Sequence, residues 1–218
     1  MLSLILSLLI AVFAFGRGAG KLFKKGTPMY WQLYICAAGC FALRQLSETV
    51  NFLCGLQGNI SVGMLGIFGC NFFLLSANYG TLDKVVDDGG AENRPARLYA
   101  LAAPVIMAAL IALVFFTWRK NDPVCGTLWF LMLLPMLPAS YFNMKHLLLP
   151  LDAVELLRAP GPCNLASLGF YLLSALCGVF CGLGNTAAAG GVSVVLSVSM
   201  LWLVSAAING REKWKTCS

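Results

Sequence analysis

The chain has 218 residues, of which 59% are hydrophobic and only 11% carry a charged side chain. Soluble domains have roughly 45–50% apolar and about 25% charged residues. The hydrophobic core of a soluble domain of this length is too small to bury such an excess of apolar side chains. The composition excludes an ordinary soluble domain. The net charge of +6 does not indicate nucleic-acid binding, because most basic residues border hydrophobic stretches. We therefore expect an all-α integral membrane protein.

The first hydrophobic stretch covers residues 2–15 and has the length of a signal peptide. A signal peptide carries its positive charge before the apolar run, whereas here Arg17 and Lys21 follow it. We interpret this stretch as a first transmembrane helix that the mature protein retains.

Further hydrophobic stretches predict about seven transmembrane helices, since roughly 20 helical residues cross a hydrocarbon core about 30 Å thick. Thr27-Pro28 opens the second stretch, and Pro135 and Pro138 lie within the fifth, where they would permit a kink. The whole chain, residues 1–218, is expected to form a single transmembrane domain. The stretches after the first are approximately residues 29–54, 61–79, 95–118, 125–149, 165–183 and 188–208.

Basic residues alternate in density between these stretches. Most of them lie in the first, third and fifth connections and in the C-terminal tail, whereas the other connections contain only Arg119 and Lys120. Connections rich in Lys and Arg stay in the cytoplasm. We expect a protein of the cell membrane with its N-terminus outside and its C-terminus in the cytoplasm.

Two parts of the chain resemble each other. Cys54-Gly55-Leu56-Gln57-Gly58-Asn59 ends the second stretch, and the similar Cys181-Gly182-Leu183-Gly184-Asn185 ends the sixth. Residues 1–80 and 126–210 would then be repeated three-helix halves, joined by a linker helix over 95–118.

This 3+1+3 plan with an external N-terminus resembles the sugar-transporting SWEET proteins and the wider PQ-loop group. The resemblance is architectural: the Pro-Gln dipeptide of that group is absent, and it assigns no role to any residue here. Microbial rhodopsins share the helix count and orientation. The seventh stretch, however, has no lysine for a retinal Schiff base.

Charged side chains inside the second stretch form the main candidate ligand-binding site. Arg44, Glu48 and Asn51 are spaced i, i+4, i+7 and share one helical face. A charge at this depth costs at least about 2.5–3.5 kcal/mol, so it should face protein or a water-filled cavity. A ligand site and a purely structural ion pair are both consistent with the pattern.

Other polar residues are weaker candidates. Asn71 and Tyr171 lie within the third and sixth stretches and would converge with Arg44 in a binding site; each also suits helix–helix hydrogen bonding. His146, the only histidine, suggests a proton-linked role. The alternative is that Lys145 and His146 reach out to the membrane surface.

We expect no cofactor and no metal site. A single histidine excludes an all-His metal centre or an ordinary haem site, and the nine cysteines are not at zinc spacing. Cys54, Cys125 and Cys181 fall near the outer surface, where the sequence allows one disulfide and determines neither its formation nor its pairing.

Three functions remain. The first is a small-molecule transporter with a polar site in the outer half of the helix bundle. The second is a seven-helix sensor or receptor that signals through a separate cytoplasmic partner. The third, an enzyme acting on lipid within the membrane, ranks last because no nucleophile elbow, HExxH motif or P-loop is present. The bilayer, an unidentified small ligand and either an oligomeric copy or a cytoplasmic protein are the expected partners.

Overall fold

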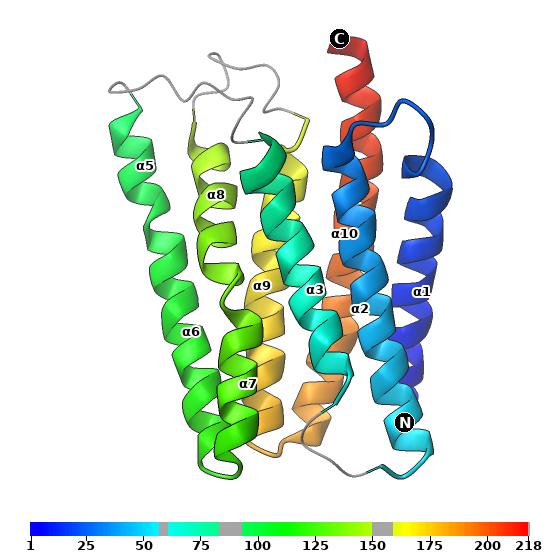
Figure 1. Ribbon diagram of the computed structural model, residues 1–218, viewed down its shortest axis with the longest axis vertical. Coiled ribbons are helices and arrows are strands. Elements are labelled where there is room, and N and C mark those ends of the chain that lie inside the picture. Colours follow the sequence, from blue (N-terminus) through cyan, green and yellow to red (C-terminus); the bar gives the residue numbers. More distant parts are fainter. Residues whose placement is uncertain (57–60, 83–92, 150–158, 218) are drawn as a thin grey trace.

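The computed structural model describes residues 1–56, 61–82, 93–149 and 159–217. Within these residues the regular structure is helical and no strand occurs, so the all-α class is confirmed. The helices run alternately in opposite directions, and the N-terminus and C-terminus lie at opposite ends of the bundle (Figure 1). We call these ends the N-terminal end and the C-terminal end.

The elements follow the expected hydrophobic stretches. The first four are α1 (Leu2–Leu22), α2 (Met29–Leu53), α3 (Gly63–Leu75) and its π-helical continuation η1 (Ser76–Leu82). The middle four are α5 (Arg94–Ala100), α6 (Ala102–Arg119), α7 (Pro123–Leu133) and α8 (Met136–Leu148). The last two are α9 (Gly161–Gly182) and α10 (Thr186–Cys217).

Five helices in the described residues are long and apolar enough to cross a membrane: α1, the pair α5–α6, the pair α7–α8, α9 and α10. This is the composition of an integral, multi-pass membrane protein. The helices α2 and α3 are not among the five. Two charged side chains, Arg44 and Glu48, lie in α2, and α3 alone has 13 residues, which extend roughly 20 Å at 1.5 Å per residue.

One face of α2 is nevertheless apolar and exposed. Leu43, Leu46, Val50 and Leu53 are spaced by three or four residues and are 44–66% exposed, whereas Arg44 between them is buried. An exposed apolar stripe of this kind suits contact with lipid rather than water. The charged face of α2 therefore points into the bundle.

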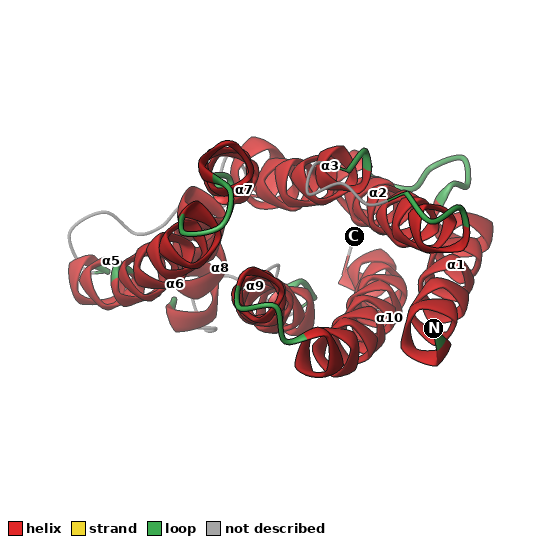
Figure 2. Cartoon of the chain, turned by 90° about the horizontal axis from the view of Figure 1, so that it is seen from below, coloured by secondary structure: helices red, strands yellow, loops and turns green. Residues whose placement is uncertain are grey.

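The interior lies between two rows of helices. In one row α1 packs against α2 and α2 against α3; in the other α9 packs against α10, and α10 also packs against α1 and α2. Figure 2 shows α2 and α3 facing α9 and α10, with α6, α7 and α8 at one side. Superposition of residues 1–80 on 126–210 as a repeat stays a prediction.

Two glycines end helices in the same way. Gly55 (φ +64°) follows α2 and Gly184 (φ +70°) follows α9, and backbone hydrogen bonds close the last helical turn at both places. Glycine is the residue best suited to this left-handed position. The sequence comparison had paired Gly55 with Gly182, which instead lies inside α9 and packs against Thr117. Part of the similarity between the two segments is thus the shared chemistry of a helix end.

The helix of the fifth stretch is interrupted at Pro135. The helix ends at Leu133 and starts again at Met136. Pro135 lies in this gap, where its ring cannot donate a backbone hydrogen bond and crowds the preceding turn.

Candidate functional site

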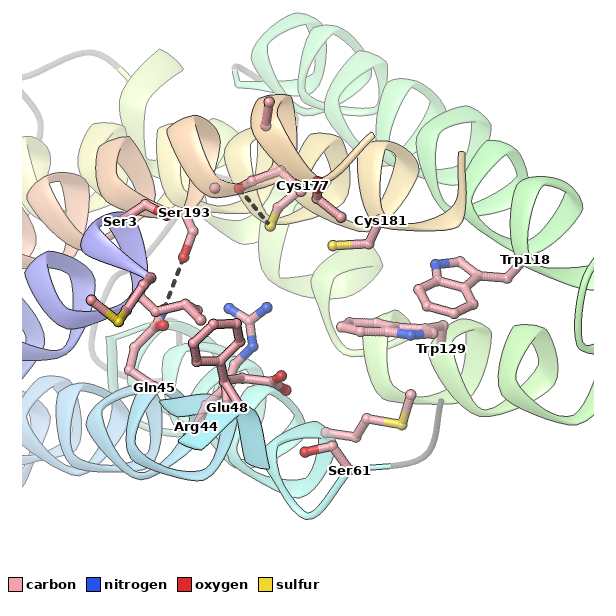
Figure 3. A pocket seen from close by; sticks show the side chains of 18 residues that line it. Ser3, Arg44, Gln45, Glu48, Ser61, Trp118, Trp129, Cys177, Cys181 and Ser193 are labelled. Carbon is pink, nitrogen blue, oxygen red and sulfur yellow. Dashed lines mark hydrogen bonds between the residues drawn. The ribbon is translucent and has the colours of Figure 1, made fainter. Parts of the chain in front are cut away.

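A cavity of about 670 Å³ lies toward the N-terminal end of the bundle (Figure 3). Its size falls within the range of roughly 300–1,000 Å³ that small-molecule sites occupy. Side chains from α1, α2, α3, α6, α7, α9 and α10 line it, and we call it the Arg44 cavity. Its charged and amide-bearing lining residues are Arg44, Gln45 and Glu48, and its hydroxyl-bearing ones are Ser3, Ser61, Thr186 and Ser193.

Arg44 is the deepest charge in this cavity. It lies nine residues before the end of α2 at Leu53, roughly 13 Å along the helix axis, and its side chain is 7% exposed. The guanidinium lies beside the Cys177 thiol, while its atoms Nε and Nη1 are buried and have no hydrogen-bond partner of good geometry. Burying a charged donor without a partner is costly, so this position favours an anionic group of a ligand.

Glu48 lines the same cavity one helical turn away. The i, i+4 spacing permits an ion pair with Arg44, but none joins the two side chains in the described part of the chain (Figure 3). The Glu48 carboxylate lies against α3 instead, where a Cβ atom at Gly63 would be 2.7 Å from Oε1. The two opposite charges therefore border the cavity separately.

Glycines of α3 allow this arrangement. A Cβ atom at Gly66 would lie 2.7 Å from the Cys40 carbonyl oxygen, and one at Gly69 would lie 2.9 Å from the Cys40 Sγ. Gly63, Gly66 and Gly69 recur every three residues and form one face of α3. Small residues on that face let the backbones of α2 and α3 approach closely, which fixes the direction of the charged face of α2.

The wall opposite the charges is aromatic. The rings of Trp118 and Trp129 stack with centroids 6.1 Å apart, and Trp118 Nε1 donates to the Gly178 carbonyl oxygen at 2.9 Å. Cys177 and Cys181, one turn apart on α9, line the cavity beside Arg44 (Figure 3). The cavity thus offers charges on one side and an apolar surface on the other.

Asn51, the third residue of the predicted charged face, is not part of the cavity wall. Its Nδ2 donates to Ser61 Oγ at 3.1 Å, and the same oxygen accepts a hydrogen bond from the Gly63 backbone N–H at 3.0 Å. Asn51 therefore ties the end of α2 to the start of α3, and Ser61 rather than Asn51 lines the cavity.

Asn71 and Tyr171 are buried away from the cavity. Asn71 Nδ2 donates to the Met132 carbonyl oxygen at 3.4 Å, while its Oδ1 has no partner. The Tyr171 hydroxyl lies beside the side chain of Asn143 without a hydrogen bond of good geometry. The structure does not bring these two residues to Arg44.

His146 belongs to a second polar group. Its side chain is 2% exposed, and its Nδ1 lies 3.3 Å from Asn78 Oδ1; Asn78 Nδ2 donates to Asn143 Oδ1. We call Asn78, Asn143, His146 and Tyr171 the buried amide cluster. The alternative in which His146 reaches the membrane surface is wrong, because the neighbouring helices cover the ring. A proton-linked role stays a prediction.

The described residues contain neither a disulfide between the candidate cysteines nor a cluster of metal-binding side chains. Cys54, Cys125 and Cys181 all carry free thiols in the structure. No group of three or more His, Cys, Asp or Glu side chains that could hold a metal ion occurs among the described residues.

Several cavity residues had not been predicted from the sequence. The sequence assigned no binding role to Cys177, Trp118 or Trp129. For the cysteines, the sequence offered one signal: the i, i+4 spacing of Cys177 and Cys181, which places both thiols on one face of α9. The two tryptophans had no comparable signal.

Comparison with known proteins gives no match: no protein-family model matches the chain, and neither a curated protein nor a solved structure is similar to it.

Proposed function

We propose that the protein is a small-molecule transporter of the membrane and that the Arg44 cavity is its substrate site. The supporting observation is the buried Arg44 side chain at the wall of a ligand-sized cavity, with no hydrogen-bond partner for its guanidinium atoms Nε and Nη1. Ionisable side chains at such depth mark substrate and ion paths in membrane proteins.

The proposal includes seven membrane crossings. Five helices have the necessary length and composition; α2 contributes an apolar outward stripe, and η1 lengthens α3 toward the C-terminal end (Figure 1). Basic residues such as Lys21, Arg97 and Arg211 gather at the C-terminal end. By the positive-inside rule this end is cytoplasmic, so the Arg44 cavity lies in the outer half.

A transport path also needs polar groups between the cavity and the cytoplasmic end. Buried side-chain atoms without hydrogen-bond partners lie on that side, among them the Tyr171 hydroxyl and the Asn143 Nδ2. Such groups usually bind water in folded proteins. These buried polar atoms favour a transporter with a polar path through the bundle over a receptor with a closed apolar core.

The test is flux through the purified full-length protein in liposomes. Vesicles are loaded with radiolabelled leucine, lactate, glucose or phosphate, and release is compared with protein-free vesicles. Release of one solute faster than the control supports transport. Specific binding of a solute without release rejects transport and favours the sensor, whereas release of none of the four rejects transport of these free solutes.

A further inference from the structure

Two opposite charges face the same cavity without forming a direct ion pair. Arg44 is 7% exposed, its Nε and Nη1 are unpartnered, and the half-buried Glu48 carboxylate lies one turn away against Gly63. In a site of low dielectric constant such charges interact strongly with whatever enters.

A ligand with a single charge would satisfy only one of them. An anion would pair with Arg44 but would stand near the Glu48 carboxylate, and a cation would pair with Glu48 near the guanidinium. Removing charges from water is tolerated when each one finds an opposite partner. A molecule that carries both charges a few bonds apart meets this condition at both positions.

We infer that the Arg44 cavity binds a zwitterion, with its carboxylate or phosphate on Arg44 and its ammonium group on Glu48. This inference rests on the proposed function and names its substrate class. A guanidinium binds a planar carboxylate or a phosphate through two parallel N–H donors, and a carboxylate accepts hydrogen bonds from an ammonium group.

The rest of the ligand is apolar. The wall opposite the charges consists of the stacked rings of Trp118 and Trp129, and the thiols of Cys177 and Cys181 line the cavity beside Arg44. Met64 and Phe52 add further apolar surface near Glu48. Aromatic and sulfur-containing side chains bind aliphatic groups through burial of apolar surface.

Two sources share this chemistry. One is a free amino acid with an aliphatic side chain, and the other is the phosphoethanolamine headgroup of a lipid. A volume of about 670 Å³ accommodates the amino acid with room to spare and the headgroup with the start of its acyl chains.

The experiment measures binding to the full-length protein in nanodiscs of phosphatidylglycerol, which carries no ammonium group. Isothermal titration calorimetry compares leucine with 4-methylpentanoate, which lacks only the ammonium group, and with 3-methylbutylamine, which lacks only the carboxylate. Dihexanoyl phosphatidylethanolamine and dihexanoyl phosphatidylglycerol form the lipid arm. We expect one zwitterion to bind at least about tenfold more tightly than its singly charged analogues, as expected for loss of a charged hydrogen bond.

Single substitutions assign the two charges. Glu48→Gln should remove the preference for the zwitterion over the anionic analogue, and Arg44→Gln the preference over 3-methylbutylamine. Lys120→Gln is the matched control, because Lys120 is exposed at the same end of the bundle and does not line the cavity.

The results separate this inference from the transport proposal. If leucine binds the parent more tightly, the free amino acid is the source; if the phosphatidylethanolamine does, the lipid is. Equal affinity for a zwitterion and its singly charged analogue, an unchanged preference in Glu48→Gln, or no binding of either zwitterion overturns the inference. Flux of lactate, glucose or phosphate in the liposome assay would still support transport in each of those cases.

Discussion

Gly66 of α3 lies so close to Arg44 of α2 that a Cβ atom at Gly66 would come within 2.9 Å of the Arg44 Cβ and 3.0 Å of the Arg44 backbone nitrogen. Backbone atoms cannot rotate away as the end of a side chain can. Any side chain at this position must therefore push α3 away from α2, and the wall that carries Arg44 and Glu48 moves with it.

The first prediction is that Gly66→Ala destabilises the protein by about 1–3 kcal/mol, the usual cost of overpacking. The measurement is thermal unfolding of the purified protein in detergent. Gly169→Ala is the control, since nothing lies within 4 Å of a Cβ atom at Gly169. Equal unfolding temperatures for the two variants would show that α3 does not pack on α2 as described.

The sequence predicted which face of α2 is buried, because a charge in hydrocarbon is costly and Arg44 and Glu48 must therefore point into the bundle. It did not predict that the two side chains would lie apart instead of forming an ion pair. The i, i+4 spacing makes an ion pair available, and only the position of Gly63 on another helix shows that the Glu48 carboxylate lies against α3. Spacing within one helix predicts which side chains share a face, but not the contacts that a second helix offers them.

The second prediction concerns the buried amide cluster. Asn143→Leu removes the acceptor of the hydrogen bond from Asn78 and leaves a buried amide unsatisfied, which costs about 1–3 kcal/mol. Asn78→Leu together with Asn143→Leu should be less destabilising than the sum of the two single changes. Thermal unfolding of all four proteins completes the cycle, and strict additivity would contradict the contact.

Contacts between segments that are distant in the sequence were not predicted. Asn78 and His146 are 68 residues apart, so the burial of His146 depends on how η1 packs on α8, which no local pattern encodes. Trp118 and Trp129 lie on either side of a turn and stack only because α6 and α7 run antiparallel. Pro135, by contrast, acts on its own helix, so the sequence alone shows where that helix can be interrupted.

The third prediction is topological. A reporter fused after Ser218 should report the cytoplasm, and one inserted between Leu56 and Ser61 should report the outside. The basis is the concentration of basic residues at the C-terminal end, which the positive-inside rule assigns to the cytoplasm. Reports from the same side would reject both the orientation and an odd number of crossings between the two sites.

The fourth prediction tests access to the cavity through Cys181, which is half-buried and lines its wall. In a Cys54→Ser background, a membrane-impermeant maleimide added to intact cells should label the protein, and Cys181→Ser should reduce that labelling. Cys163, which is buried and outside the cavity, supplies the control: Cys163→Ser should leave labelling unchanged. Labelling that is lost in Cys181→Ser but occurs only in inverted vesicles would show that the cavity opens to the other side.

The last prediction separates a functional Arg44 from a structural one. The double variant Arg44→Met with Glu48→Leu removes both charges from the cavity wall and leaves no buried charge behind, so it should fold and insert with little change in unfolding temperature. Arg44→Met alone should be tolerated as well, because no ion pair with Glu48 is lost and the remaining carboxylate is only half-buried. A structural ion pair would behave differently, since breaking a buried pair costs several kcal/mol.

Ligand binding and flux should respond in the opposite way. Both variants lose the guanidinium, whose charge-assisted hydrogen bonds to an anionic group we expect to dominate affinity. Whichever solute the parent protein releases from liposomes should therefore stay inside vesicles that contain either variant, while Lys120→Gln releases it normally. Parent-like flux through the double variant would assign Arg44 and Glu48 to the packing of α2 and move the substrate site elsewhere in the bundle.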